Sequence, residues 1–300
     1  MAGKVFITGA NGRLGASVQE RIGAIPLVRK PSGLKGEIVT DFSENQLKVI
    51  LKDASVIVHI AGSVDTLDKK RMEEGNVLLT NAIVESAPKG CRVIFAGSIS
   101  VYGKELKGKP ADEETPVSPD SAYARTKYQA ERLVAKMKDH VIFRIGTIYG
   151  PRFEDYFRVL SQIEKGKMSL IGKGDNRIPF VHVDDVAKAF EAAVSKGQGV
   201  YVLAGEPLTQ KEIFDIAAGE LGVEAPKKSM DRGIAMFIAA LMGSWGRVRG
   251  KKPKLTQEHI SVLSYDRVFD CRKAKADLGF APRPLGEGIR DIVKAYKKRG

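Results

Sequence analysis

The chain has 300 residues, with 49 Lys and Arg against 36 Asp and Glu, a formal net charge of +13 and 43% hydrophobic residues. This composition is ordinary for a soluble globular protein with a substantial core, arranged as one large domain or two small ones. The positive charge is spread along the chain and no nucleic-acid-binding motif accompanies it. A solvated basic surface is therefore favoured, and no nucleic acid partner is expected.

Two cysteines, Cys91 and Cys271, argue against a disulfide framework and fit a reducing cytoplasm. An apolar run begins directly after Lys4, so we expect no signal peptide and a cytoplasmic protein. The four histidines have no metal-ligand spacing, so no metal site is predicted. His59 and His182, flanked by apolar residues, are interpreted as packed strand histidines.

The first half of the chain alternates short apolar runs with amphipathic helical segments. Strands are predicted at 4–8, 24–28, 36–42, 54–62, 91–96 and 141–145. Helices are predicted after the first strand to about residue 22, at 46–51, around 76–81, and from 121 to about 137. This alternation indicates an α/β fold with a parallel, doubly wound sheet of the Rossmann type. Ligands bind such sheets at the carboxyl ends of the strands.

A glycine-rich turn, Gly9-Ala10-Asn11-Gly12-Arg13-Leu14-Gly15, follows the first strand and opens a helix. In that context the first glycine permits a tight turn, the second lets the backbone approach a pyrophosphate, and the third allows the helix to pack closely on the strand. The N–H groups at the helix start can then hold phosphates. The alternative is a tight turn that binds nothing. The predicted cofactor-binding residues here are Gly9, Asn11, Gly12, Arg13, Leu14 and Gly15.

The second predicted strand ends at Arg29, without an acidic residue near this point. An acidic residue here would favour the ribose hydroxyls of NAD, whereas an arginine accommodates the extra phosphate of NADP. NADP is therefore favoured, NAD stays possible, and the alternative is that Arg29 is an exposed charge at a strand end.

A tyrosine and a lysine lie four residues apart at the start of the 121–137 helix. Positions i and i+4 share a helix face, so the phenol of Tyr123 and the ammonium of Lys127 can face one cleft. A free phenol titrates near ~10, and a nearby fixed cation lowers that pKa. The pair is a plausible acid/base device, although the same spacing occurs by chance on solvated helix faces.

Beyond residue 150 the alternation becomes less regular. Residues 1–150, joined by 181–204, are predicted to form the dinucleotide-binding domain, and 151–180 with 205–300 mainly a substrate-binding region. Thr209 and Glu212 have the capping-box pattern for a helix through Leu221. The apolar segment 233–245 is too short to span a bilayer, which needs ~20 apolar residues. A helix covering the substrate pocket is favoured over an interfacial helix that touches anionic lipid.

Four segments together resemble the extended short-chain dehydrogenase/reductase family, the NAD(P)-dependent epimerase/dehydratase group. They are Thr8–Gly15, Gly97-Ser98, Tyr123-x-x-x-Lys127 and Tyr149-Gly150-Pro151-Arg152. The resemblance extends over essentially the whole chain, down to 273–282. Residues 178–185 look most like the branch that holds hydroxysteroid dehydrogenases and dihydroflavonol reductases.

The resemblance implies catalytic roles for three residues. Tyr123 would be the acid/base, Lys127 would lower the pKa of Tyr123 and hold the nicotinamide ribose, and Ser98 would hydrogen-bond the substrate oxygen. Ser98 is preferred to Ser100 because it stands four residues before Tyr102, as in the family. Such a set would move a proton on an oxygen while hydride leaves or joins its carbon.

The resemblance also implies binding roles. Asp41 and Phe42 match positions that contact adenine, Ala61 and Gly62 match a loop that passes the cofactor phosphates, and Asn81 matches the buried amide behind that loop. Thr147 stands where many nucleotide-sugar enzymes of the family carry Asn. The candidate substrate residues are Ser100, Thr147 and Arg152. Family members are often homodimers, which is expected here too.

Three functions are compatible with the sequence. The first is an NAD(P)-dependent oxidoreductase acting on a ketone or secondary alcohol, with a slight preference for a hydrophobic or small substrate. The second is a nucleotide-sugar epimerase or dehydratase with the same three catalytic residues. The third is an NADP-sensing binding protein without turnover, against which the retention of all three residues argues.

Overall fold

The computed structural model describes residues 3–64, 68–106, 110–248, 260 and 263–299. Its centre is a seven-stranded sheet in the order β11-β6-β5-β4-β1-β2-β3, in which every neighbouring pair is parallel. The strands are β1 (Lys4–Thr8), β2 (Ile25–Val28), β3 (Ile38–Val39), β4 (Ala54–His59), β5 (Arg92–Ser98), β6 (His140–Ile145) and β11 (Gly199–Leu203).

The order in which the chain adds parallel strands to the sheet reverses between β1 and β4. From β1 the order runs outward to β2 and β3 on one side, and then from β4 outward on the other. In doubly wound sheets a ligand crevice opens at such a switch point, beyond the carboxyl ends of the strands. The predicted Rossmann-type fold is therefore confirmed.

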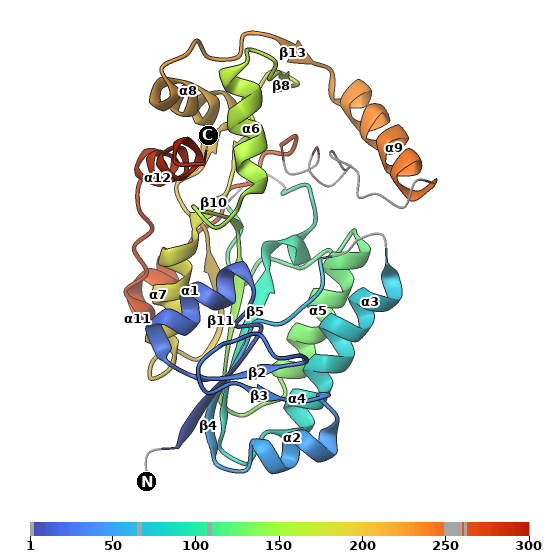
Figure 1. The fold of residues 1–300 in the computed structure, drawn as a ribbon, viewed down its shortest axis with the longest axis vertical. Coiled ribbons are helices and arrows are strands. Elements are labelled where there is room, and N and C mark those ends of the chain that lie inside the picture. The colour runs from blue at the N-terminus through green and yellow to red at the C-terminus, as the bar shows by residue number, and fades with distance from the viewer. Residues whose placement is uncertain (1–2, 65–67, 107–109, 249–259, 261–262, 300) are drawn as a thin grey trace.

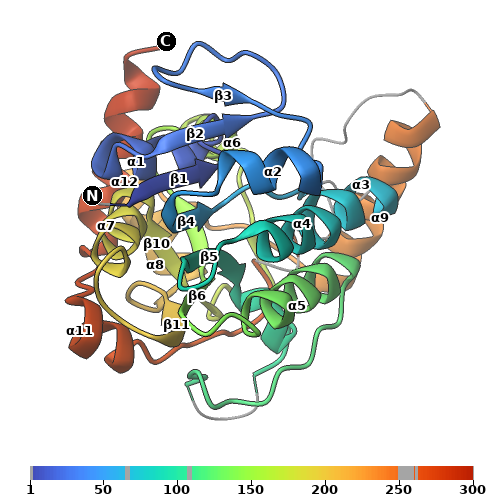
Figure 2. The ribbon, with the colours of Figure 1, turned by 90° about the horizontal axis from the view of Figure 1, so that it is seen from below.

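Helices cover both faces of the sheet (Figures 1 and 2). One face carries α1 (Arg13–Ile22), α7 (Val183–Ala193) and α11 (Arg272–Leu278). The other carries α2 (Glu44–Ile50), α4 (Leu79–Ser86) and α5 (Ala122–Val134). Because α11 packs on the sheet, it is an exception to the predicted assignment of 205–300 mainly to a substrate-binding region.

The segment that leads into α4 differs from the single helix predicted around residues 76–81. It begins as α3 (Lys69–Glu73), passes through a π-helical turn at Glu74–Leu78 (η1), and continues as α4. A π-helical turn adds a residue to the helical repeat and shifts which side chains face inward. Asn76, which lies in this turn, is buried.

Most of the remaining elements form a smaller lobe beyond the carboxyl edge of the sheet (Figure 1). Its core lies between α6, α8 and α12, and Thr209 and Glu212 form the predicted capping box at the start of α8. The elements are β7 (Thr147–Tyr149), α6 (Asp155–Glu164), β8 (Leu170–Ile171), β9 (Arg177–Ile178), β10 (Phe180–His182), β12 (Leu208–Thr209), α8 (Gln210–Leu221), β13 (Ser229–Met230), α9 (Arg232–Val248) and α12 (Leu285–Lys297).

The predicted apolar segment 233–245 lies within α9, which projects from one side of the molecule (Figures 1 and 2). Ala235 and Ala239 are buried against the body, whereas Ile234, Phe237 and Leu241 are more than half exposed. Among the described residues, no helix is both long enough and apolar enough to cross a bilayer.

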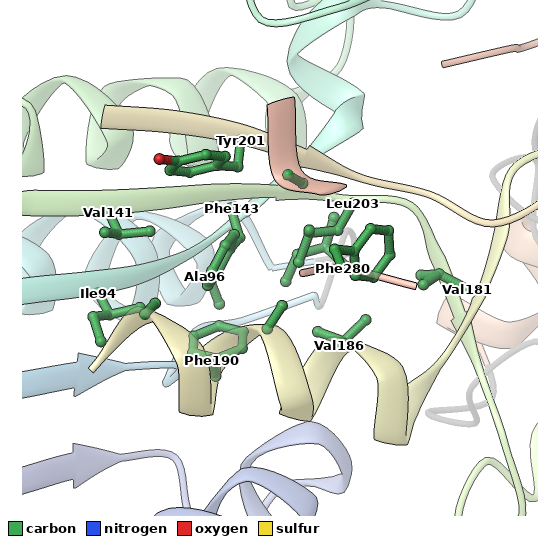
Figure 3. Packing of buried hydrophobic residues seen from close by; sticks show 14 of the residues in the cluster. Ile94, Ala96, Val141, Phe143, Val181, Val186, Phe190, Tyr201, Leu203 and Phe280 are labelled. Atoms are coloured by element: carbon green, nitrogen blue, oxygen red, sulfur yellow. The ribbon is translucent and has the colours of Figure 1, made fainter. Parts of the chain in front are cut away.

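The largest apolar cluster fills the space between the sheet and α7 (Figure 3). The rings of Phe143 on β6 and Phe190 on α7 meet edge to face, with centroids 4.8 Å apart, and both are fully buried. Figure 3 shows Ile94, Ala96 and Val186 beside them. This packing anchors β5 and β6, the two strands that lead into the catalytic region.

We predict that Phe190→Ala lowers the free energy of unfolding by about 3–5 kcal/mol, because it removes a buried ring and leaves a cavity. Urea denaturation of both proteins measures the difference. Val49→Ala, at a position 69% exposed, is the control and should change stability by less than about 0.5 kcal/mol. Similar small effects for both variants would contradict the assigned core.

Candidate active site

The glycine-rich turn packs too tightly to admit side chains at two positions. A Cβ added at Gly15 would lie 1.9 Å from the carbonyl oxygen of Gly9, and one added at Gly9 would lie 2.6 Å from the backbone nitrogen of Ala61. Gly9 also has φ +77°, which favours glycine. The turn therefore brings the start of α1 against the loop that follows β4.

The exposed rim of this turn fits a dinucleotide pyrophosphate. Asn11 and Gly12 are exposed, and Gly12 caps α1 without a side chain. The first N–H groups of a helix have no partners within it, and they carry the positive end of the helix dipole. The side chain of Arg13 reaches across to the smaller lobe, where its Nη1 lies 2.6 Å from Oδ2 of Asp155.

The predicted adenine end lies where β2 and β3 finish. The guanidinium carbon of Arg29 is 5.7 Å from the ring centroid of Phe42, and Phe42 has φ +63° and is largely buried. The carboxylate of Asp41 accepts a hydrogen bond from the backbone N–H of Ser43, which lowers the pKa of that carboxyl. Arg29 and Phe42 thus meet beyond the ends of β2 and β3, and Asp41 directly precedes Phe42.

A buried chain of hydrogen bonds links β1, β4 and α4. His59 contacts the hydroxyls of Thr8 (Nδ1, 2.7 Å) and Thr80 (Nε2, 2.9 Å). Burial, with a smaller effect of the Lys127 charge, lowers the pKa of His59 to about 3, so the ring is neutral. The Thr80 hydroxyl donates to the carbonyl of Asn76, so it must accept from Nε2–H, and Nδ1 accepts from Thr8.

This chain fixes the loop after β4 because the Thr8 hydroxyl also accepts from the backbone N–H of Ala61. The prediction that His59 is a packed strand histidine is confirmed, since it is fully buried. His182 is likewise buried. The sequence did not reveal that both ring nitrogens of His59 are used to hold a loop at the carboxyl edge of the sheet.

The buried amide behind this loop is Asn76, not Asn81 as the resemblance implied. Asn76 is 1% exposed; its Oδ1 accepts from the backbone N–H of Ser63, and its Nδ2 donates to the carbonyl of Ser63 and the hydroxyl of Thr126. Asn81 is only half-buried on α4. Asn76 faces inward because it lies in the π-helical turn, which periodicity in the sequence did not reveal.

Gly62 is required beside that amide. A Cβ at Gly62 would lie 2.8 Å from Oδ1 of Asn76 and 3.8 Å from the ammonium nitrogen of Lys127. The loop Ala61-Gly62, the buried amide and the lysine of α5 therefore meet at one point. This convergence joins the predicted cofactor-phosphate loop to the predicted catalytic helix.

Helix α5 starts immediately before the predicted catalytic pair. Ser121 caps it by accepting a hydrogen bond from the backbone N–H of Ala124, and Tyr123 is half-buried while Lys127 is only 5% exposed. The Lys127 ammonium lies 4.4 Å from the ring centroid of Phe95 on β5. The cation–π contact holds the charge over the strand that leads to Ser98.

Burial lowers the pKa of Lys127 to about 8, against an opposing effect of the nearby Glu131 carboxylate. The ammonium is therefore the main form at neutral pH, and it is lost as the pH rises through about 8. A cation in this position favours the phenolate form of a neighbouring tyrosine. The predicted acid/base role of Tyr123 depends on this charge.

Ser98 ends β5, at the carboxyl edge of the sheet, and its Oγ accepts from the backbone N–H of Ser100. The 3₁₀ turn that follows, η2 (Ile99–Tyr102), lies against α5. Ser100 Oγ is buried, without a hydrogen-bond partner among the described residues. Ser100 thus lies inside the 3₁₀ turn, whereas Ser98 lies at the end of β5, where the predicted catalytic serine is expected.

The other two candidate substrate residues lie in different surroundings. Thr147 begins β7, where its backbone N–H donates to the carbonyl of Pro179, and it is half-buried. Arg152 is exposed and forms an ion pair with Glu20 on α1. Arg152 therefore has a partner within the protein, Glu20. The prediction that Arg152 contacts the substrate is not supported by this ion pair.

We predict that Gly15→Ala weakens dinucleotide binding by about tenfold or more, because the added methyl would displace the Gly9 carbonyl from the turn that faces the phosphates. Calorimetric titration with NADH and NADPH measures the affinity. Gly219→Ala, at a helical glycine with open space around its Cβ position, is the matched control and should bind normally. Equal affinities in the two variants would contradict the assigned cradle.

Comparisons with known proteins agree with this geometry. The model of the "NAD dependent epimerase/dehydratase family" matches residues 5–204. "Short-chain dehydrogenase/reductase family 42E member 1" of Xenopus laevis is 27% identical, over 99% of this chain and 88% of its own length. "3beta-hydroxysteroid-dehydrogenase/decarboxylase isoform 2" of Arabidopsis thaliana is 27% identical, over 84% of this chain and 50% of the length of that relative.

Among solved structures, a UDP-glucuronic acid 4-epimerase from Bacillus cereus in complex with NAD is 21% identical, with a TM-score of 0.75 and coverage of 99% of both chains. At this identity the likeness shows the fold. The family match over two thirds of the chain shows more. The chain belongs to the NAD-dependent epimerase/dehydratase family, within the extended short-chain dehydrogenases/reductases, and is an NAD-dependent oxidoreductase or epimerase.

Proposed function

We propose that this protein transfers hydride between a nicotinamide dinucleotide and a ketone or secondary alcohol, with Tyr123 as the acid/base. The observation that carries the proposal is the buried Lys127 ammonium. It lies on the helix face that also presents Tyr123, beside the Ala61-Gly62 loop and over the strand that ends at Ser98. A buried cation is costly unless nearby groups compensate it, so the placement of Lys127 beside the candidate cofactor loop suits a catalytic use.

Each residue then has a distinct task. The nicotinamide, when bound, supplies or accepts the hydride. Tyr123 gives a proton to the substrate oxygen in reduction and takes it back in oxidation, while Ser98 donates a hydrogen bond to that oxygen as charge develops on it. Lys127 favours the phenolate of Tyr123 and can donate to the cofactor ribose. The glycine turn and the start of α1 would hold the pyrophosphate.

An apolar substrate is supported by the smaller lobe. Phe180 is buried beside Thr147 on β7, and Ile178 is buried in the same apolar cluster. Ile234, Phe237 and Leu241 expose an apolar face of α9. One relative is named a hydroxysteroid dehydrogenase/decarboxylase, which also favours an apolar alcohol or ketone. We therefore place a hydrophobic carbonyl or alcohol ahead of a sugar nucleotide.

A nucleotide-sugar epimerase is the second candidate, favoured by the fold shared with the UDP-glucuronic acid 4-epimerase. The same three residues would act, but the hydride would return to the substrate and no net cofactor would be consumed. The two reactions are separated by screening hydrophobic ketones and alcohols and UDP- and dTDP-sugars, while following both cofactor absorbance and sugar configuration.

We predict that Tyr123→Phe lowers the turnover of the best substrate by about 10²–10⁴-fold, because the proton donor is removed. Cofactor affinity should change little, which titration with NADPH would verify. Tyr128→Phe, at a half-buried position on the same helix, is the control. Unchanged turnover in Tyr123→Phe would remove the mechanism, and sugar epimerisation without net cofactor use would reverse the substrate ranking.

We further propose that NADP is the preferred dinucleotide, held at its 2′-phosphate by Arg29. Loss of one charge-assisted hydrogen-bond donor is worth about 1.5–3 kcal/mol, so Arg29→Ala should weaken NADPH binding by about tenfold or more and leave NADH binding nearly unchanged. Arg21→Ala, which removes an exposed arginine paired with Glu191 on α7, is the control. Tight NADH binding with negligible NADPH binding by the unaltered protein would disprove this preference.

A further inference from the structure

A single buried arginine connects the two halves of the proposed catalytic set. Arg144 on β6 donates from Nη2 to Oε1 of Glu131 at 2.6 Å and from Nε to both carboxylate oxygens at 3.2 Å. Its Nη1 donates to the Tyr102 hydroxyl at 2.7 Å. The side chains of Arg144 and Glu131 are only 8% and 6% exposed.

The two partners of Arg144 belong to the two elements that carry catalytic residues. Glu131 lies on α5, eight residues after Tyr123 and four after Lys127, so the three share one helix face. Tyr102 ends η2, the turn that begins directly after Ser98. The guanidinium therefore fixes the tyrosine–lysine helix relative to the serine turn.

The Tyr102 end of this network is itself anchored. The Tyr102 hydroxyl donates to the carbonyl of Asp112 at 2.6 Å, and Arg144 Nη1 also donates to the carbonyl of Glu113. The guanidinium carbon of Arg144 is 4.9 Å from the Tyr102 ring centroid. Burial raises the pKa of Tyr102 to about 12, against the opposing effect of Arg144, so the hydroxyl stays protonated.

Glu131 has a second, electrostatic effect on the site. Its carboxylate raises the pKa of Lys127, opposing the effect of burial. Among the described residues, the titratable groups that interact electrostatically with Lys127 are Glu131 on the same helix and His59 on β4, which is neutral. Tyr123 shares the helix face of Lys127. Glu131 thus helps to keep Lys127 protonated at neutral pH.

We propose that Arg144, through Glu131 and Tyr102, is a positioning residue that sets Ser98 against the Tyr123–Lys127 helix and maintains the Lys127 charge. The inference rests on the proposed function of Tyr123. A purely structural ion pair is the competing explanation. Buried ion pairs often contribute little net stability compared with apolar residues of similar volume, so a variant that replaces both charges can separate the two explanations.

The test is the double variant Glu131→Met/Arg144→Met. Both charges are removed together, so neither is left unpaired, and Tyr102 retains its hydrogen bond to Asp112. A single replacement would leave a buried charge and could prevent folding. We expect the double variant to melt within a few degrees of the unaltered protein, to bind NADPH, and to turn over its substrate at least about tenfold more slowly.

A second readout does not require turnover. The phenol of Tyr123 is titrated by ultraviolet absorbance, as the difference between proteins with and without Tyr123→Phe. Without Glu131, Lys127 loses its proton more easily, so the phenolate is less favoured and the titration midpoint of Tyr123 should rise. An unchanged midpoint, together with turnover within twofold of the unaltered protein, would overturn the proposal.

Arg92→Met/Asp139→Met is the matched control. This ion pair, with Arg92 Nε 3.0 Å from Asp139 Oδ1, lies at the opposite end of β5 and β6. It should lower the melting temperature, because Arg92 also donates to two backbone carbonyls, but leave the Tyr123 titration and turnover unchanged. If the unaltered protein turns over none of the carbonyls, alcohols or sugar nucleotides, the proposed function fails, and the Tyr123 titration alone decides whether Arg144 acts as inferred.

Discussion

The buried ammonium of Lys127 is the constraint on which the proposed catalytic region depends. Removing a charge from water is expensive unless other groups compensate. Here the compensation comes from the Phe95 ring below it and from Glu131 one helical turn away. Burial still brings the pKa of the ammonium down to about 8. The group is therefore charged at neutral pH yet held close to the point where it would lose its proton.

That constraint explains why α5 is fastened at several points. Ser121 caps its start, and the Thr126 hydroxyl accepts from the Asn76 amide, which also holds the loop after β4. Glu131 is held from the other side by Arg144. A shift of the helix would break these contacts. The Lys127 ammonium would then be exposed to water or left buried without the groups that compensate its charge. The same contacts align the helix with the cofactor loop, so stability and function depend on one set of bonds.

The cofactor side of the fold could be predicted from local sequence patterns. Gly9 and Gly15 mark the turn because their spacing follows a strand and opens a helix. In the smaller lobe, the capping box at Thr209 likewise marks the start of α8. These signals depend on neighbours in the chain, which a sequence displays directly.

Features that depend on distant partners could not be predicted in that way. Asn81 was assigned as the buried amide, whereas a π-helical turn places Asn76 there, and no periodic pattern announces an extra residue in a helix. No local pattern in the sequence indicates the partners of Arg144. Its bonds to Glu131 and Tyr102, 13 and 42 residues away, exist only once β5, β6 and α5 have packed together.

The smaller lobe, the predicted substrate side, has mostly shorter strands than the sheet that forms the cofactor side. It contains two-residue strands such as β8 and β9. It also contains α9, whose outer side chains Phe237 and Leu241 are more than half exposed. Short elements of this kind can change without disturbing the sheet, because few backbone bonds depend on them. On the proposed function, the sheet and α5 would set the chemistry, and the smaller lobe would select the molecule on which it acts. Under that proposal the apolar side chains of the smaller lobe favour a hydrophobic substrate, whereas the fold alone does not choose between a carbonyl compound and a sugar nucleotide.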